Sequence, residues 1–138
     1  MSEILVDTGP LVAYLDRSDR HHAWAKQCFM QISQPLLTCE AVIAEALFLL
    51  RRGGIDTDGL LNLMSRGLVV PEFRLGPEIA SIQQLMKSYL NVPMSLADAC
   101  LVRMAEIYEA SEIMTLDSDF TIYRKSRRKV IPLRRPSR

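Results

Sequence analysis

The sequence has few cysteines and no long apolar run, and both shortages narrow the class of protein. No apolar run approaches the ~20 residues needed to span a bilayer, and acidic residues near the start argue against a secretory signal. The cysteines are odd in number and far apart, so they match neither a disulfide framework nor a zinc pattern: Cys28, Cys39 and Cys100. We therefore expect a reduced, cytoplasmic protein with no membrane association, whose thiols pack as small apolar groups.

Internal repeats and low-complexity linkers are also missing, which favours one globular unit. A chain of 138 residues is about the length of one domain. Such a domain buries roughly two-thirds of the surface that its unfolded chain exposes. The 49% apolar and 24% charged residues are ordinary proportions for a soluble globular protein, so composition excludes a disordered or fibrous class.

The charged residues are unevenly distributed along the chain. Residues 1–123 hold all 16 acidic residues and nine of the 17 basic ones, whereas residues 124–138 hold the other eight and no acid. A basic block of this kind suits a polyanion such as nucleic acid. A solvated tail that aids solubility explains it equally well, and composition leaves both explanations open.

Short apolar runs alternate with segments of helical spacing. The expected strands are 3–7, 35–39, 68–75, 112–117 and 130–133, although Pro71 weakens the third. The expected helices are 10–17, 23–32, 40–52, 56–66, 77–90 and 95–110. Alternation of this kind is typical of βαβ units, in which right-handed crossovers place helices on both faces of a parallel sheet. The sequence therefore predicts an α/β fold with a parallel sheet.

Carboxylates stand where the expected strands end. Asp7 ends the first strand, Asp117 ends the strand 112–117, and Asp98 lies in the first turn of the helix that precedes that strand. Ligands of open parallel sheets bind beyond the carboxyl ends of the strands, so these acids are expected at one edge.

The helix 40–52 adds two further acids. Glu45 stands within AVIAEALFLL, where nine of ten residues are apolar, and Glu40 lies in the first turn. An ionised group taken out of water needs a partner or a cation. Converging acids also repel one another, and all-oxygen ligands favour Mg²⁺ or Mn²⁺. The acids together predict a metal site that is open to a phosphodiester and a water molecule.

Each acid taken alone has a structural explanation. Asp7 could form a turn before Gly9-Pro10, and Ser95 to Asp98 fits a capping box. Asp117 and Asp119 could cap the next segment, and Glu40 could favour a helix N-terminus. Glu45 could form a buried ion pair with an arginine such as Arg103. The metal prediction depends on the joint pattern.

Four segments that carry these acids resemble the PIN domain family. They are VDTGPLVAYLD, LTCEAVIAEALFLL, MSLADACLVRMAE and IMTLDSDF, in this order along nearly the whole chain. The resemblance implies a three-layer α/β/α sandwich around a parallel sheet of four or five strands, related to the Rossmann-like folds. It places a single domain at 1–133 and a basic tail at 134–138.

The resemblance also implies the site residues. The acids that match the family's catalytic, metal-binding positions are Asp7, Glu45, Asp98 and Asp117. Thr8 and Thr115 match polar positions that support the site, and Asp119 matches an acid found in some members. Glu40 has no fixed counterpart, so which glutamate lies nearer the metal is open. We favour Glu45, because a five-residue step turns about 140° on a helix and its apolar flanks suggest no other role.

Stand-alone family members of this size are mostly toxins of toxin–antitoxin pairs, the VapC-like group. The resemblance therefore implies Mg²⁺- or Mn²⁺-dependent cleavage of single-stranded or structured RNA, in which a metal-activated water attacks phosphorus. It implies a homodimer held inactive by a small antitoxin protein. Four basic residues are expected to contact RNA phosphates: Arg124, Lys125, Arg127 and Arg128.

Other classes fit the sequence less well. A non-catalytic PIN-like module that binds RNA or scaffolds a complex is the main alternative, and retention of all four acids argues against it. Topoisomerase–primase domains have a glutamate on the first strand, where this chain has Asp7. Haloacid dehalogenase phosphatases have a second acid two residues later, where this chain has Gly9, and the late lysine of receiver domains is not evident.

Overall fold

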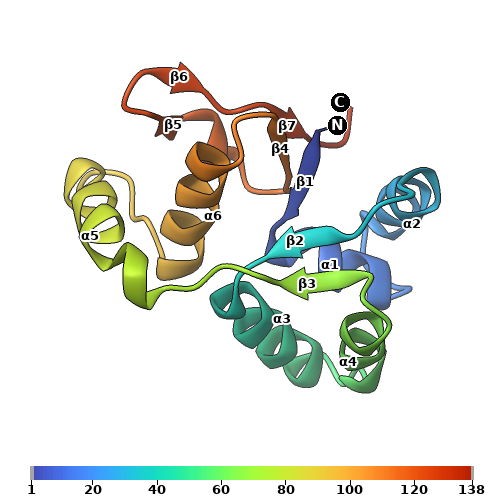
Figure 1. The fold of residues 1–138 in the computed structure, drawn as a ribbon. Helices are drawn as coiled ribbons and strands as arrows, with labels where there is room; N and C mark the ends of the chain where they lie inside the picture. Colours follow the sequence, from blue (N-terminus) through green and yellow to red (C-terminus); the bar gives the residue numbers. More distant parts are fainter. Residues whose placement is uncertain (1, 138) are drawn as a thin grey trace.

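A five-stranded parallel sheet runs through the centre of the molecule (Figure 1). The computed structural model describes residues 2–137. The strands lie in the order β3-β2-β1-β4-β7, and every adjacent pair is parallel. Their bounds are β1 (Glu3–Val6), β2 (Leu36–Thr38), β3 (Val69–Pro71), β4 (Ser111–Met114) and β7 (Leu133–Arg134).

Helices cover both faces of this sheet, so the predicted three-layer α/β/α sandwich is confirmed, with five strands. Four helices connect β1, β2 and β3 on one side: α1 (Thr8–Leu15), α2 (His22–Gln31), α3 (Glu40–Arg52) and α4 (Asp58–Ser65). The chain then returns across the sheet to β4, and this crossover carries α5 (Ile79–Ser88) and α6 (Leu96–Ile107) on the other side (Figure 1). Short 3-10 turns occupy η1 (Gly76–Glu78) and η2 (Ser118–Thr121).

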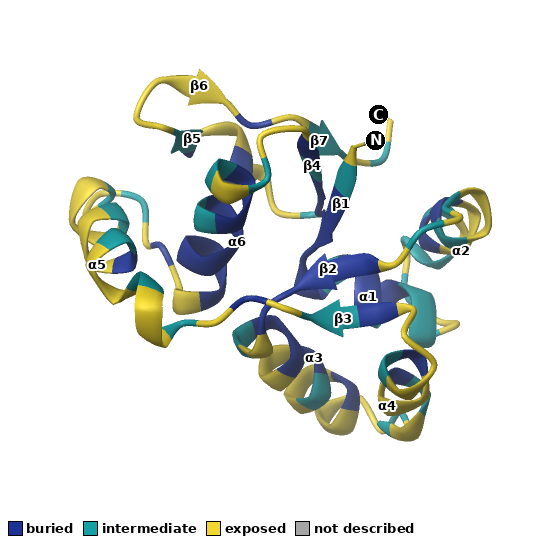
Figure 2. Ribbon diagram, in the orientation of Figure 1, coloured by how far each residue is buried: buried dark blue, intermediate teal, exposed yellow. Residues whose placement is uncertain are grey.

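The core lies between the sheet and these two helical layers (Figure 2). Leu5, Val6, Ile113 and Met114 on the two central strands are fully buried, as expected for strands covered on both faces. The three cysteines are buried, which agrees with the prediction that they pack as small apolar groups. Among residues 2–137, no helix is both long and apolar enough to span a membrane.

Proline explains two departures from simple strands. Pro71 ends β3, which lies at the edge of the sheet, where a missing N–H is tolerated. The prediction of one strand over 130–133 is wrong, because the segment is divided between β6 (Lys129–Val130) and β7 with Pro132 between them. The structure therefore gives Arg134 a place in the sheet, where its Nε donates to Glu112 at 2.6 Å. Arg138, at the end of the expected tail, lies outside the described residues.

A small hairpin stands apart from the main sheet. β5 (Arg124–Lys125) pairs with β6 in antiparallel register. Ser126 and Arg127 in the connecting turn have positive φ values of 50° and 70°. The hairpin contacts α6, and the Ser126 N–H donates to the Glu106 carboxylate at 2.7 Å.

Candidate functional site

Asp7 stands at the junction between β1 and α1. The first strand ends one residue earlier than predicted, and Asp7 is the N-cap of α1. Its Oδ1 accepts the Thr8 N–H at 2.8 Å, and its Oδ2 accepts the Thr115 hydroxyl at 2.7 Å. The residue is only 7% exposed, so the fold holds this carboxylate in a fixed, mostly dry position.

Thr115 joins the ends of the two central strands. It follows β4 directly and is fully buried. Its hydroxyl donates to Asp7 and accepts the Asp117 N–H at 2.9 Å. Gly9 lets α1 approach this segment, since a Cβ there would lie 3.2 Å from the Leu116 side chain. A single hydroxyl thus positions one carboxylate and the backbone of a second.

Asp98 reaches the same region from the start of α6. Its backbone N–H donates to the Ser95 hydroxyl at 3.0 Å, and its own Oδ2 accepts the Ser95 N–H at 3.3 Å. The capping box is therefore present. The same Oδ2 also accepts the hydroxyl of Tyr123 at 3.1 Å, and Tyr123 is fully buried. Capping and a second, long-range contact fix Asp98 together.

Asp117 and Asp119 follow β4 on a more open surface. Asp117 is exposed and caps η2, because its Oδ1 accepts the Asp119 N–H at 2.9 Å. Asp119 is half-buried, and its charge contributes to raising the pKa of the Tyr123 phenol, for which burial is the larger cause. Both acids thus lie beside the Asp98–Tyr123 pair.

The charges of Asp7, Asp98 and Asp117 influence one another. Burial is the main cause that raises the pKa of Asp7 from 3.8 to about 6, and the charges of Asp98 and Asp117 add to it. Burial also raises the pKa of Asp98, again with a contribution from Asp117. These effects indicate that the three carboxylates lie near one another, beyond the carboxyl ends of β1 and β4.

No lysine or arginine forms an ion pair with these three acids within residues 2–137. The ion pairs there are Arg103 with Glu78 and Glu106, and Arg134 with Glu112. The Thr8 hydroxyl oxygen, next to Asp7, is buried and has no hydrogen-bond partner. The three carboxylates thus lack a basic partner there, and the Thr8 hydroxyl next to Asp7 lacks a hydrogen-bond partner.

Glu45 is placed differently from what its sequence context suggests. The expectation that the Glu45 side chain is buried is wrong, because Glu45 and Glu40 are both exposed on α3. The buried face of that helix is formed by Val42, Ile43, Ala46 and Leu50. The suggested partner Arg103 binds other glutamates. α3 nevertheless packs against α1, which Asp7 caps, and against α6, which carries Asp98 in its first turn.

The donor set suits a hydrated, hard cation. No three His, Cys, Asp or Glu side chains in the described part of the chain are close enough to enclose an ion by themselves. Mg²⁺ usually keeps several waters and takes only one or two carboxylates. Carboxylate oxygens that lack a protein cation, beside an unsatisfied hydroxyl, match that requirement. Asp7, Asp98 and Asp117 are the residues that could hold such an ion.

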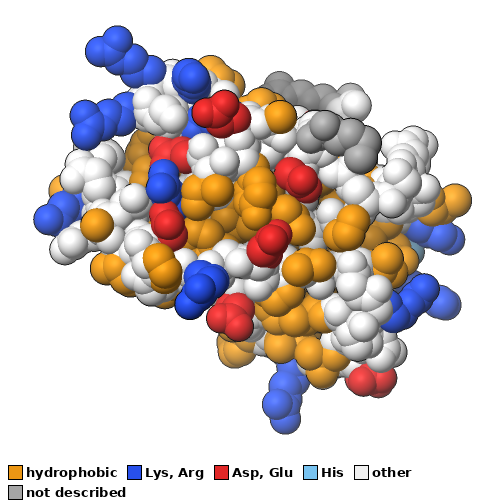
Figure 3. All heavy atoms as spheres, viewed as in Figure 1, with side chains coloured by type: hydrophobic (Ala, Val, Ile, Leu, Met, Phe, Trp, Pro, Cys, Tyr) orange, Lys and Arg blue, Asp and Glu red, His pale blue; other side chains and the backbone are white. Residues whose placement is uncertain are grey.

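The four basic residues expected to meet RNA divide into two pairs. Arg124 donates from Nη1 to three carbonyl oxygens, of Thr121, Ile122 and Tyr123, and Lys125 donates from Nζ to that of Glu109. Arg127 and Arg128 are exposed at the hairpin turn and have no such bonds within residues 2–137. Figure 3 shows Lys and Arg side chains projecting at the upper left, where Figure 1 places the hairpin.

Comparison with known proteins places this arrangement in a family. The PIN domain family matches residues 4–126, which include all the acids described above. The chain belongs to the PIN domain family. The expected resemblance is therefore confirmed over most of the chain.

Two proteins of Mycobacterium tuberculosis are similar to this PIN domain. Ribonuclease VapC26 is 28% identical over 116 residues, which cover 83% of this chain and 86% of that protein. The crystal structure of VapC20, a toxin that cleaves the sarcin–ricin loop, superposes with a TM-score of 0.80. That match covers 94% of this chain and 100% of the other at 19% identity, so it supports the fold alone.

Proposed function

We propose that this PIN domain is a metal-dependent endoribonuclease that acts in the cytoplasm and is the toxin of a toxin–antitoxin pair. Its substrate would be single-stranded or structured RNA. The observation that carries the proposal is the group of three carboxylates at the strand ends, electrostatically coupled and without a basic partner in the described part of the chain. The likeness to a VapC ribonuclease supports the reaction class.

The acids have distinct tasks in this proposal. Asp7, Asp98 and Asp117 would hold Mg²⁺ or Mn²⁺, with Glu45 as a fourth ligand from α3. The ion, when bound, would supply a water of lowered pKa and neutralise charge on the phosphodiester. Thr115 fixes the Asp7 carboxylate through its hydroxyl, and Tyr123 does the same for Asp98. The protein thus contributes preorganised oxygen ligands.

Substrate binding would use the hairpin. The exposed side chains of Arg127 and Arg128 are available to bind phosphates, whereas those of Arg124 and Lys125 already donate hydrogen bonds to backbone carbonyls. Phosphate contacts position a nucleic acid without reading its sequence. The hairpin would therefore set affinity more than specificity.

Partner binding would use the apolar surface of α3 and α4. Phe48 is 62% exposed, and Leu61 on the neighbouring helix is 45% exposed. Hydrophobic side chains gather over the lower helices in Figure 3. Exposed apolar patches mark interaction surfaces in soluble proteins. A small antitoxin or a second copy of the chain would cover them.

The decisive experiment is RNA cleavage by the purified chain with Mn²⁺, with and without a chelator. The nuclease proposal predicts chelator-sensitive cleavage that Asp7→Asn and Asp98→Asn both abolish. RNA binding without cleavage would instead support the main alternative, a non-catalytic RNA-binding module. Hydrolysis of a phosphomonoester in place of RNA would indicate a phosphatase.

The two glutamates of α3 can be separated by metal titration. We expect Glu45→Gln to weaken Mn²⁺ binding more than Glu40→Gln, because only Glu45 matches the family's acid position. Both residues are exposed, so neither variant removes core packing. Equal losses, measured by calorimetric titration of Mn²⁺ into both variants, would mean that the assignment of the glutamate is wrong.

A further inference from the structure

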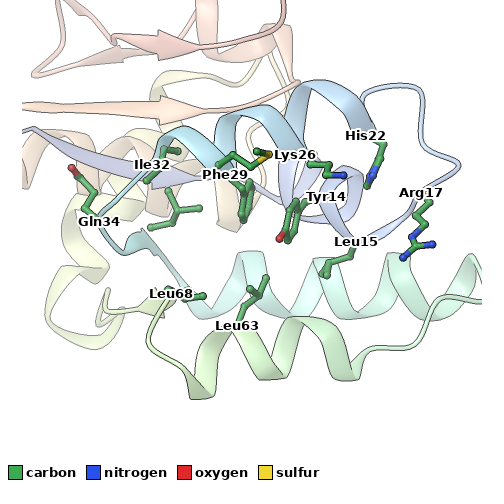
Figure 4. A pocket seen from close by; sticks show the side chains of 12 residues that line it. Tyr14, Leu15, Arg17, His22, Lys26, Phe29, Ile32, Gln34, Leu63 and Leu68 are labelled. Carbon is green, nitrogen blue, oxygen red and sulfur yellow. The ribbon is translucent and has the colours of Figure 1, made fainter.

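A hollow of about 450 Å³ opens between α1, α2 and α4 (Figure 4). Its lining includes Leu36, the first residue of β2, and Leu68, the residue before β3. It therefore lies at the edge of the sheet where the strands begin, whereas the carboxylates stand where strands end. A volume of this size is ordinary for small-ligand sites in proteins.

The interior of this pocket is apolar and partly aromatic. Leu36 and Leu63 on its wall are buried. The rings of Tyr14 and Phe29 lie parallel, with centroids 4.0 Å apart and planes 4° apart. Figure 4 shows the Tyr14 hydroxyl pointing into the space above Leu63, and within residues 2–137 that hydroxyl has no hydrogen-bond partner. A ring or an alkyl chain would be well accommodated there.

Basic groups stand on one side of the pocket. Arg17, His22 and Lys26 belong to its lining, which contains no Asp or Glu. The His22 Nδ1 bonds to the Ala13 carbonyl at 2.8 Å, which fixes the ring. Arg17 and Lys26 form no ion pair in the part of the chain that the structure describes.

Asp16, an acid whose charge acts on His22 at this basic edge, already accepts hydrogen bonds. Asp16 accepts hydrogen bonds from the Ser18 N–H at 3.0 Å and the Ser18 hydroxyl at 2.7 Å. It does not line the pocket. The charges of Arg17 and Lys26 are thus available to an anion from solution.

We propose that this pocket binds an organic anion whose apolar or aromatic body lies on Tyr14, Phe29 and Leu63, and whose carboxylate or phosphate meets Arg17 and Lys26. The positive charge lies at one end of the pocket. In Figure 4 the basic side chains lie toward the α1–α2 loop, and the neutral Gln34 lies at the other end. A ligand with one charged head and one apolar body fits this polarity better than a segment with acids along its length.

Calorimetric titration with 2-naphthoate tests the proposal, beside the neutral 2-naphthalenemethanol and with 2-naphthyl phosphate to distinguish the two head groups. We expect naphthoate or the phosphate to bind at least fivefold more tightly than the alcohol. Arg17→Gln with Lys26→Gln should weaken binding of the anion about fivefold, or about 1 kcal/mol, and leave the alcohol unchanged, because ion pairs at exposed sites are individually weak.

The matched control is Arg20→Gln with Arg66→Gln, which removes two exposed cations outside the pocket and should change binding less than twofold. Amide shifts at Tyr14 and Phe29 should locate the ligand. Equal binding of the alcohol and the anions, no binding, or equal losses in both double variants would overturn the proposal. So would binding of an acidic, aromatic peptide when both anions fail. The readout needs no RNA, so failure of the proposed nuclease would leave this result unaffected.

Discussion

Replacing Asp7 with asparagine tests how strongly the fold resists this buried charge. Burial and two neighbouring acids raise the pKa of Asp7 from 3.8 to about 6. A shift of that size corresponds to about 3 kcal/mol of destabilisation of the ionised form in the folded state. Asparagine keeps an oxygen for the Thr8 N–H but cannot accept the Thr115 hydroxyl at its amide nitrogen, which costs about 1 kcal/mol.

We therefore expect Asp7→Asn to be more stable than the wild type by about 2 kcal/mol at pH 7.5 in the presence of a chelator, or roughly 5–8 °C in Tm. The sign follows from the raised pKa. The folded state binds the Asp7 proton more tightly than the unfolded state, so the penalty is absent below pH 3.8 and complete above pH about 6. The advantage of the variant should thus grow as the pH rises through this window.

Urea denaturation followed by circular dichroism, from pH 4.5 to 8, measures this difference. Asp117→Asn is the matched control, because Asp117 is exposed and its substitution should change stability by less than about 0.5 kcal/mol. Mg²⁺ should reduce the gap by stabilising only the wild type. A variant that is less stable than the wild type at pH 7.5, or a gap that does not vary with pH, would refute the reasoning.

Substitutions at Thr115, at Tyr123 and in the hairpin test the roles assigned to these residues. Thr115→Val should weaken Mn²⁺ binding roughly tenfold or more, whereas Thr115→Ser should largely restore it; supporting residues of metal sites have effects of about 10–100-fold. Tyr123→Phe should also lower Mn²⁺ affinity, by several-fold, because Asp98 loses its hydroxyl donor, and calorimetry would measure both. Arg127→Asn with Arg128→Gln should weaken RNA binding and lower the salt slope by up to about 1.4, with the cleavage step unchanged.

The controls for these variants differ in kind. Circular dichroism spectra that match the wild type would show that Thr115 and Tyr123 variants remain folded, so that lost metal binding reports on ligand positioning. Asparagine is chosen at position 127 because that residue has a positive φ of 70°, which asparagine tolerates. An unchanged salt slope, unchanged Mn²⁺ affinity in Tyr123→Phe, or a serine variant as weak as valine would each contradict the assigned role.

Local patterns predicted most of the fold. The bounds of α3 agree with its predicted range, since the apolar spacing begins at Ala41, directly after Glu40, and Gly53 follows the last turn. Asp7, Asp98 and Asp117 could be expected at one edge of the sheet because the ends of parallel strands meet there. The raised pKa values of Asp7 and Asp98 agree with that placement.

Features that depend on distant contacts could not be predicted. Tyr123 lies 25 positions after Asp98 in the sequence, and no local spacing indicates the hydrogen bond between them. The apolar run around Glu45 suggested a buried helix, yet Phe48 on the same helix is 62% exposed, because α3 buries only the face formed by Val42, Ile43, Ala46 and Leu50. Division of the last strand depends on the path of the chain past Pro132.

The most direct test is a crystal structure with Mn²⁺ and an anomalous difference map. The central claim predicts a Mn²⁺ peak bounded by the carboxylates of Asp7, Asp98 and Asp117, lost in crystals of Asp98→Asn. A map in which Mn²⁺ lies elsewhere, or in which those carboxylates remain without a cation at saturating Mn²⁺, would contradict it.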